Sequence, residues 1–379
     1  MSENIEDWTN EVHQGDVIEK LQEMPSESVD LVITSPPYYA LRDYGEDTES
    51  IWGGEEGCSH DWSVEAKTSS QGGNNTEDNP PDVGANESTQ DTRLRGSGGI
   101  ESNYCSKCDA WRGQLGLEPT PQQFVQNITE FANEVYRILK PSGSFYLNMG
   151  DSYAGSGTGQ TSHKESSSSP VDTSNVGIQA KCKMMIPHRI SISLIDEGWI
   201  CRNDIVWSKP NPMPESVTDR RSTTFEYIFH FVKKKDYYYD LDSIRKPHVS
   251  NIPDRVEKGN LQPDSVSSEG NHEFKPENRV HENGKNPGDI QEITTANHSE
   301  AHFAVFPKEL IKPHIKSSCP EDGVVLDPFI GSGTTAIAAE ELDRDWVGID
   351  LNKDYVDMSY DRIEDETTKI FDDRSFMDY

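Results

Sequence analysis

The stretch GVVLDPFIGSGTTAIAAEELDRDWVGID, Gly323–Asp350, decides the fold of this chain. Its apolar run VVLD predicts a buried strand, TAIAAEEL predicts a helix, and WVGID predicts a second strand. A strand, a helix and a strand in this order form a βαβ unit, whose strands lie parallel in one sheet. Ligands bind such sheets at the carboxyl ends of the strands, and the glycine-rich turn lies at that edge.

The turn after the first strand carries the residues of a nucleoside site. Gly331 and Gly333 allow backbone N–H groups to approach a ligand closely, and Asp350 can accept hydrogen bonds from both hydroxyls of a ribose. The turn lacks the complete G-x-G-x-x-G pattern and has no lysine for phosphates. We therefore expect a nucleoside cofactor without a pyrophosphate; a tight turn with no ligand is the alternative.

The rest of the chain repeats the alternation of strands and helices. Strands are predicted over 12–15, 29–34, 144–151, 201–209 and 224–234, and helices over 17–24, 121–140, 185–200 and 306–319. The run VDLVIT at 29–34 is typical of a parallel strand that is covered on both faces. Three polar stretches without an apolar period, 66–104, 154–180 and 247–300, predict mobile loops or insertions. We expect a doubly wound, Rossmann-like α/β sheet with polar insertions.

The chain is strongly acidic, with 67 Asp and Glu against 35 Lys and Arg and a net charge of −32. This charge opposes generic binding to nucleic acid, because phosphates are contacted by Lys and Arg. A hydrophobic content of 32% indicates either disorder or an unusually acidic surface, and the 14 Tyr and 12 Phe favour a folded protein. Concentrated salt would screen the self-repulsion, so we expect a halophilic source, such as an archaeon with a high-salt cytoplasm.

The sequence shows neither a long apolar run nor the charged and apolar regions of a signal peptide at MSENIEDWTN. We therefore expect an intracellular protein that makes no contact with membranes. No feature indicates an obligate protein partner.

A second candidate site lies at TSPPY, Thr34–Tyr38, where the strand VDLVIT ends. Two consecutive prolines donate no hydrogen bonds and hold a rigid turn whose preceding carbonyls point outward. Ser35 adds a hydroxyl and Tyr38 an aromatic face. Such a turn can hydrogen-bond an amino group and stack on its ring; a turn that only ends the strand is the alternative.

Two close pairs of soft ligands form a third candidate site. Cys58-x-His60 and Cys105-x-x-Cys108 together match the donor set of a tetrahedral structural zinc. Such a metal would anchor the polar insertion between the pairs. Free structural thiols are the alternative.

TSPPY, DPFIGSGTT and the later GID together resemble the S-adenosylmethionine-dependent amino-methyltransferases of DNA, in the permuted arrangement in which SPPY precedes the cofactor motif. The resemblance extends over QGDVIEKLQEMPSESVDLVITSPPYYALRDYG, EVYRILKPSGSFYLNMGDSY, IVWSKPNPMPES, EYIFHFVKKKDYYYD and HFAVFPKELI. Relatives of this kind also carry CxH and CxxC followed by a run similar to Ala110–Pro121. The family's methyl donor, S-adenosylmethionine, is therefore the expected cofactor, and double-stranded DNA the expected partner.

The resemblance implies a role for each matching residue. It places Phe329, Gly331 and Gly333 around the methionine moiety, Asp350 on the ribose and Asp16 near the adenine, with Asp327 and Thr334 completing the cofactor site. It places Ser35, Pro36, Pro37 and Tyr38 around the target base. Ser at the first position resembles enzymes that act on N4 of cytosine, whereas Asp or Asn usually accompanies N6 of adenine, which is the alternative. The base must leave the duplex to be reached.

DNA contacts are expected from the region 183–250, which holds 11 Lys and Arg against 9 Asp and Glu. Arg220, Arg221, Lys233 and Lys234 alternate there with aromatic residues, as in a DNA-facing cleft. A solvated surface with ordinary charges is the alternative.

The resemblance also implies a division of the chain. We expect a catalytic-motif half at 1–57, a zinc-type insertion at 58–112, the remaining catalytic and DNA-facing region at 113–246, a variable target-recognition segment at 247–300 and a cofactor-binding half at 301–379. A zinc-stapled DNA-binding module without catalysis, and an enzyme acting on RNA or on a protein amide, are the other functions that remain open.

Overall fold

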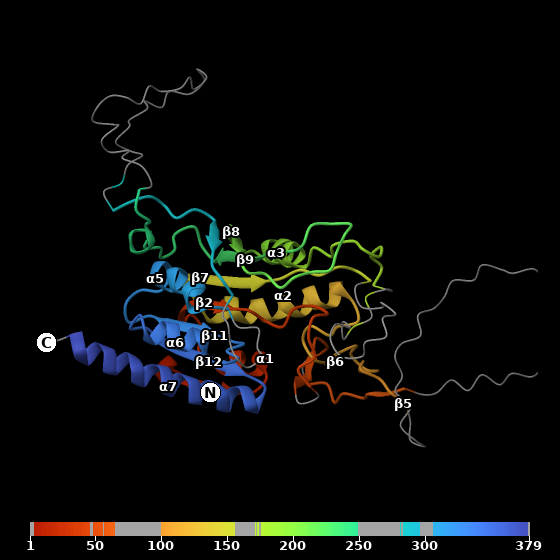
Figure 1. Ribbon diagram of the computed structural model, residues 1–379. Helices are drawn as coiled ribbons and strands as arrows, with labels where there is room; N and C mark the ends of the chain where they lie inside the picture. Colours follow the sequence, from red (N-terminus) through yellow and green to blue (C-terminus); the bar gives the residue numbers. More distant parts are fainter. Residues whose placement is uncertain are drawn as a thin grey trace, which may run out of the picture. The chain divides into compact units, whose positions relative to one another are not determined.

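An eight-stranded mixed sheet with helices on both faces is the centre of the computed structural model (Figure 1). The structure describes residues 4–45, 48–55, 57–64, 100–155, 171, 173, 176–248, 281, 283–295 and 306–377. The chain divides into two units, the first comprising 1–36, 131–150 and 191–379 and the second 37–130 and 151–190. The sheet belongs to the first unit.

The order of the strands contains a topological switch point. The strands follow one another as β1 (Glu11–Gln14), β12 (Asp345–Asp350), β11 (Val324–Asp327), β2 (Val29–Thr34), β7 (Leu139–Met149), β9 (Phe225–Val232), β8 (Ile200–Ser208) and β10 (Ile290–Glu292). The first five are parallel, β9 is antiparallel to both β7 and β8, and β10 is parallel to β8. The chain leads from β11 to β12 on one side and from β2 to β7 on the other. The switch point therefore lies between β11 and β2, where doubly wound sheets bind their ligands.

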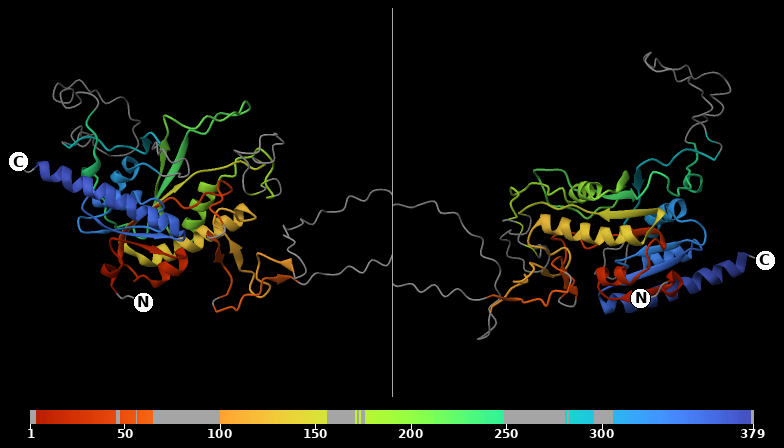
Figure 2. Two further views of the ribbon diagram at one scale, coloured as in Figure 1. Left: turned by 60° about the horizontal axis from the view of Figure 1, so that its bottom comes forward. Right: turned by 180° about the vertical axis from the view of Figure 1, so that it is seen from behind.

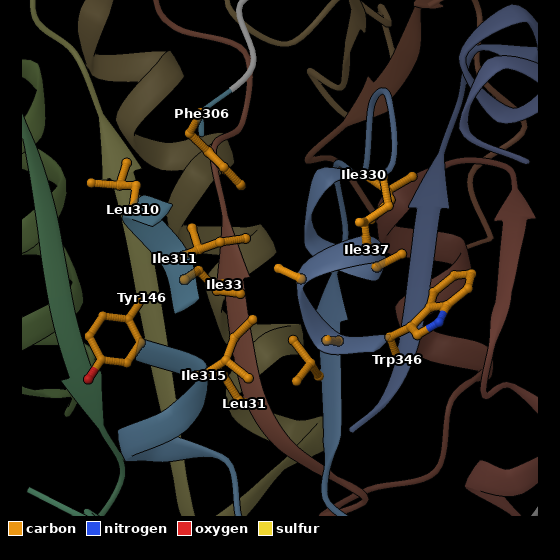
Figure 3. Packing of buried hydrophobic residues seen from close by; sticks show 14 of the residues in the cluster. Leu31, Ile33, Tyr146, Phe306, Leu310, Ile311, Ile315, Ile330, Ile337 and Trp346 are labelled. Atoms are coloured by element: carbon orange, nitrogen blue, oxygen red, sulfur yellow. The ribbon is translucent and has the colours of Figure 1, made fainter. Parts of the chain in front are cut away.

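Three helices cover one face of the sheet: α5 (Lys308–Ser318), α6 (Thr334–Glu340) and α7 (Lys353–Met377). In Figure 3, Leu31 and Ile33 of β2 lie against Ile311 and Ile315 of α5. All four side chains are at most 2% exposed, and burying such a side chain contributes about 2 kcal/mol. The alternation of a strand explains the pattern, since Leu31 and Ile33 are two residues apart and share a face.

The opposite face is aromatic. Phe145 of β7 points away from α5, because its neighbour Tyr146 belongs to the core on that side. The Phe145 ring lies 6.2 Å from Phe131 of α2 (Pro121–Ile138) and 5.4 Å from Trp199. Other helices in the described part of the chain are α1 (Val17–Glu23) and α3 (Ile186–Asp196), and Ile5–Asp7 and Asp242–Ile244 form single 3-10 turns.

The predicted doubly wound α/β sheet is confirmed, with two corrections. Residues 290–292, inside the stretch 247–300 that was predicted to be a loop or insertion, form β10 and pair with β8. The other correction concerns β7. That strand begins at Leu139, five residues before the predicted start at Ser144. Val29 pairs with Leu139, and a register irregularity between Val29 and Leu31 accommodates Pro141 and Gly143 within the strand. Most of the predicted polar insertions lie outside the described residues, namely 66–99, 156–170, 249–280 and 296–300.

The second unit contains two small antiparallel ribbons. β3 (Ser50–Trp52) pairs with β6 (Trp111–Gly113), and β4 (Ser63–Val64) pairs with β5 (Ile100–Glu101). Its core includes the Tyr39 and Phe124 rings, 5.6 Å apart. Across both units, none of the described helices has the length and apolar character needed to cross a bilayer.

Candidate active site

The glycine-rich turn joins β11 to α6 at the carboxyl edge of the sheet. Asp327 ends β11, and its carboxylate accepts hydrogen bonds from the Phe329 N–H at 3.1 Å and from the Thr335 hydroxyl at 2.5 Å. Ile330 donates its N–H to the Ile349 carbonyl of β12 at 2.9 Å. These bonds hold the turn between β11 and β12, directly before α6 begins.

The two glycines of the turn have different surroundings. Both have positive φ, 51° at Gly331 and 81° at Gly333. A Cβ at Gly333 would lie 3.1 Å from Ile363 and 3.3 Å from Ser359, so Gly333 allows α7 to pack closely. A Cβ at Gly331 would meet no atom nearer than the Phe329 carbonyl oxygen at 4.0 Å. Gly331 therefore leaves space in which a ligand can approach the backbone.

Asp350 lies at the end of β12, beside this space. Its carboxylate accepts the Gly331 N–H at 3.0 Å and the Asn352 N–H at 2.9 Å. Burial raises the pKa of Asp350 to about 6, although the backbone hydrogen bonds oppose the shift. The side chain remains partly exposed, so its lone pairs are accessible to the hydroxyls of a ligand.

Asp16 lies at the same edge of the sheet, after β1. Gln14 is in register with Asp350, and Gly15 donates its N–H to the Asp350 carbonyl at 3.0 Å. The Asp16 carboxylate accepts the N–H groups of Ile18 and Glu19 at 2.9 and 3.1 Å and so caps α1. Asp16 and Asp350 thus follow adjacent parallel strands at the same edge of the sheet.

Asp327 also links the turn to the other candidate motif. The Thr34 hydroxyl at the end of β2 donates to the Asp327 carboxylate at 2.6 Å across the switch point. Burial raises the pKa of Asp327 to about 6, against the hydrogen bonds from Thr335, Thr34 and Phe329. The buried Asp327 carboxylate therefore connects the end of β2 to the glycine-rich turn.

Ser35 follows Thr34 and contacts the neighbouring strand. The Asn148 amide of β7 donates to the Ser35 hydroxyl at 3.4 Å and to the Glu226 carboxylate of β9 at 3.1 Å. Glu226 forms an ion pair with Lys209. Sequence analysis missed Asn148, Glu226 and Lys209, because each is separated from Ser35 by more than a hundred residues of chain.

Arg362 of α7 is a further residue that sequence analysis missed. Its guanidinium donates to the Ser332 carbonyl at 3.0 Å and to the hydroxyls of Ser332 and Thr334, both at 2.8 Å. Arg362 therefore holds the turn on the side where Gly333 allows α7 to pack closely. No sequence motif around Arg362 predicts this role.

Pro37 and Tyr38 belong to the second unit, where residues 110–121 hold their backbone. Gly116 has φ of 93°, and a Cβ there would lie 2.9 Å from the Tyr38 carbonyl oxygen. Ala40 donates its N–H to the Gly116 carbonyl at 2.8 Å. The buried Glu118 carboxylate accepts the Gly116 N–H at 2.8 Å and the Asn127 amide at 2.9 Å. Burial raises the pKa of Glu118 to about 7.

The predicted metal ligands lie together in the second unit. The ligand atoms of Cys58, His60, Cys105 and Cys108 are all within 4.8 Å of one another. Tetrahedral zinc with sulfur ligands requires donor separations of about 3.8 Å, so the cluster fits this metal. Although burial opposes it, N–H groups of Asp61 and Lys107 at 3.4 Å lower the pKa of the Cys105 thiol. Thiolate is the form that binds a metal.

The predicted DNA-contacting residues lie at opposite ends of the sheet. Arg220 and Arg221 belong to the loop 209–224, which follows β8 and precedes β9 and so lies at the edge that carries Ser35 (Figure 2, green). Lys233 and Lys234 follow β9, which runs antiparallel to β7, so they lie at the other edge. The prediction that Lys233 and Lys234 face the same cleft is therefore corrected.

The surroundings of Lys233 support this correction. Its ammonium donates to the Leu139 carbonyl, where β7 begins, at 2.7 Å and lies 4.8 Å from the centre of the Tyr136 ring. The side chain is 6% exposed. Through these two contacts the Lys233 side chain connects β9 to β7 and α2.

Comparison with known proteins agrees with this arrangement. A family model described as DNA methylase, for the N6 and N4 methyltransferases, matches residues 29–361. The type II methyltransferase M.XycI of Xanthomonas campestris pv. cyanopsidis is 30% identical over 361 residues, 94% of this chain and 88% of that one. The type II methyltransferase M.Cfr9I of Citrobacter freundii is 29% identical over 362 residues, with the same coverage of 94% and 88%.

Among solved structures, PvuII DNA methyltransferase (cytosine-N4-specific) has a similar fold, with a TM-score of 0.51 at 19% identity, covering 95% of this chain and 92% of that one. The sheet, the glycine-rich turn and TSPPY thus occur in a chain that the family model spans over most of its length. The chain belongs to the N6/N4 DNA methylase family of S-adenosylmethionine-dependent DNA amino-methyltransferases.

Proposed function

We propose that the protein transfers a methyl group from S-adenosylmethionine to N4 of cytosine in duplex DNA, after the base has left the helix. The observation that carries the proposal is the position of Ser35 at the end of β2. Its neighbour Thr34 is hydrogen-bonded to Asp327, the last residue before the glycine-rich turn. The candidate acceptor for an amino group and the candidate cofactor turn thus lie on adjacent strands at the switch point.

The chemistry requires acceptors for N–H groups. An exocyclic amino group is a poor nucleophile, because its lone pair is delocalised into the ring. Hydrogen bonds to the Ser35 hydroxyl and the Pro36 carbonyl would favour the pyramidal nitrogen and hold it in line with the methyl group. S-adenosylmethionine supplies, when bound, an electrophilic methyl group on a sulfonium. We assign Tyr38 to stacking on the flipped base.

The residues of the turn fit the cofactor. The space above Gly331 admits a ligand to the backbone, and the partly exposed Asp350 can accept ribose hydroxyls. Phe329, whose ring lies 5.2 Å from Phe131, remains partly exposed and is suited to the methionine moiety, together with Gly333 and Thr334. Asp16, one strand beyond Asp350, is assigned to the adenine.

The choice of cytosine rests on Ser35. The PvuII enzyme is itself described as cytosine-N4-specific, but at 19% identity it supports the fold and not the target base. Mass spectrometry of nucleosides from methylated duplex DNA tests the choice directly. We expect 4-methylcytosine. Detection of 6-methyladenine would instead assign N6 of adenine as the target, and detection of no methylated base would contradict both targets.

Ser35→Ala provides the matched control for that experiment. We expect the variant to lose most methyl transfer and to keep its affinity for S-adenosylmethionine, because Ser35 is assigned to the base and not to the cofactor. Equal transfer by the variant and the wild type would remove Ser35 from the site.

We assign DNA contacts to Arg220 and Arg221 in the loop 209–224. An Arg220→Ala, Arg221→Ala variant should bind duplex DNA more weakly with unchanged cofactor affinity, whereas Lys234→Ala, at the opposite edge of the sheet, should bind DNA normally.

The type II methyltransferases among the relatives also support a role as the modification enzyme that accompanies a restriction enzyme.

The acidic surface predicts an unusual salt response. If the protein functions in molar salt, its DNA affinity must depend more on stacking and base contacts than on phosphates, so affinity should fall only shallowly with the logarithm of salt concentration. Filter binding across a salt series measures the slope. A steep slope would contradict the halophilic interpretation.

We propose that Cys58, His60, Cys105 and Cys108 hold one structural zinc. The support is the closeness of their four ligand atoms, within 4.8 Å. Elemental analysis of protein purified without chelator should give about one zinc per chain, and a Cys108→Ser variant should give less. Active protein free of metal would contradict the proposal.

A further inference from the structure

Helix α7 lies beside α6 and the glycine-rich turn that precedes it (Figure 1). Arg362 and Ile363 follow Ser359 by three and four positions in α7, so these side chains lie on one face of the helix. Ile363 and Ser359 are the side chains nearest to the position of a Cβ at Gly333. All of these residues belong to the first unit of the structure. One face of α7 therefore packs on the turn.

A single nitrogen of Arg362 makes three contacts with the turn. Its Nη1 donates to the Ser332 carbonyl and to the hydroxyls of Ser332 and Thr334. Ser332 is 6% exposed and Thr334 is 3% exposed, so water has little access to these acceptors. The Ser332 carbonyl belongs to the peptide that joins Ser332 to Gly333. Arg362 therefore holds the orientation of that peptide.

The turn needs such a constraint because of its glycines. Gly331 and Gly333 have φ of 51° and 81°, and glycine adopts positive φ about as readily as negative φ. The turn could therefore adopt other conformations if nothing opposed them. The Asp350 carboxylate holds the Gly331 N–H at 3.0 Å, and Arg362 holds the carbonyl of the next residue, Ser332. Two charged side chains thus hold consecutive residues of the turn.

The positive charge of Arg362 opposes the start of α6, so it does not serve the stability of that helix. Thr334 is the first residue of α6, and the N-terminal end of a helix carries partial positive charge, which favours acidic side chains. Burial lowers the pKa of Arg362, and the Glu366 carboxylate opposes this shift from one turn further along α7. Glu366 also accepts the Lys308 ammonium of α5 at 2.9 Å, which anchors this part of α7.

We propose that Arg362 is a positioning residue for the cofactor, which acts through the Ser332 carbonyl to keep the turn in the conformation that binds S-adenosylmethionine. When only a fraction of the free protein has the competent conformation, the apparent affinity for the ligand falls in proportion to that fraction. Arg362 therefore raises the affinity without touching the ligand. The inference rests on the proposed cofactor site at this turn, and it is independent of the target base.

Arg362→Met tests the proposal, because it keeps an apolar stem on α7 and removes the donors to the turn. We expect calorimetric affinity for S-adenosylmethionine to fall about tenfold, as for a turn that is competent in about one molecule in ten. The single-turnover rate of methyl transfer at saturating S-adenosylmethionine should stay within about twofold of the wild type, since the bound cofactor restores the turn. Affinity for duplex DNA should not change. A merely structural role would lower all three quantities together.

Arg344→Met is the matched control. Arg344 is also a half-buried arginine that donates to backbone carbonyls, those of Leu342 and Cys319. It lies just before β12 begins, at the edge of the sheet opposite to the turn. The control should keep the wild-type affinity for S-adenosylmethionine at whatever melting temperature it has. Wild-type cofactor affinity in Arg362→Met, or equal losses of affinity in both variants, would overturn the proposal.

Hydrogen exchange of the unaltered protein provides a second test if Arg362→Met does not fold. Coupling is reciprocal, so a contact that raises cofactor affinity must itself be stabilised by the cofactor. S-adenosylmethionine should therefore slow amide exchange in peptides that cover residues 355–366 more than in peptides of β8, which lies four strands from β11. Equal slowing, or none, would overturn the proposal. A wild-type protein that does not bind S-adenosylmethionine would instead contradict the cofactor site itself.

Discussion

Thr34 and Asp327, 293 residues apart in the chain, are joined by a 2.6 Å hydrogen bond at the switch point of the sheet. Thr34 is the residue before Ser35, and Asp327 is the residue before the glycine-rich turn. Because the Asp327 carboxylate is buried and also accepts the Thr335 hydroxyl and the Phe329 N–H, it couples the positions of both motifs. One buried carboxylate thus holds the two halves of the proposed active site in register.

Thr34→Val should therefore destabilise the protein and weaken cofactor binding. The change keeps the shape of the side chain but removes one donor from a buried carboxylate, which costs about 1–3 kcal/mol. Chemical denaturation and calorimetric binding of S-adenosylmethionine measure the two effects. Thr368→Val is the control, because the exposed Thr368 hydroxyl donates to the Glu364 carbonyl of its own helix, α7. Equal stabilities of the two variants would contradict the role of Thr34.

The two glycines of the turn should respond differently to alanine. Both positions have positive φ, so either substitution costs about 1 kcal/mol in backbone strain. Gly333→Ala should cost more, because its Cβ would also press on Ile363 and Ser359 of α7. Gly331→Ala should retain more stability and lose more affinity for S-adenosylmethionine. Melting temperatures and calorimetry would contradict this division if the order were reversed.

Binding of S-adenosylmethionine should weaken in acid because of Asp350. The free protein holds the pKa of Asp350 at about 6, and ribose hydroxyls donate to the ionised carboxylate. As the pH falls below about 6 the carboxylate takes up a proton, so affinity should fall toward a limit of tenfold per pH unit. Asp350→Asn should bind more weakly at pH 8 and lose this dependence. The ratio of the two affinities cancels titration of the cofactor, and a constant ratio from pH 5 to 8 would contradict the assignment.

Glu118 should make folding stability depend on pH in the second unit. Its pKa is raised to about 7 from 4.5, so the folded state binds more protons than the unfolded state between these values. The stabilising contribution is present below pH 4.5 and is lost as the pH rises through about 7. Glu118→Gln should flatten this decline, since Gln carries no charge and can still accept the Gly116 N–H. Denaturation midpoints from pH 5 to 8 test it, and parallel curves for the two proteins would exclude Glu118 as the cause.

Much of the fold was predictable because its signals are local. The continuous apolar run at β2, the glycines of the turn before α6 and the acid at the end of β12 are determined by periodicity and turn chemistry within short windows. The start of β7 was predicted wrongly for the same reason. Pro141 and Gly143 locally favour an end of structure, whereas pairing with β2 extends the strand to Leu139.

The sequence by itself determined the doubly wound sheet, the glycine-rich turn and the position of TSPPY at a strand end, because each depends on residues close together in the chain. Only the tertiary structure decided which charged side chains lie near these motifs. The antiparallel direction of β9 moved Lys233 to the far edge and brought Glu226 near Ser35 through Asn148. Arg362 reached the turn from α7. Such contacts join residues 28 to 113 positions apart, so packing of the whole sheet, and no local pattern, selects them.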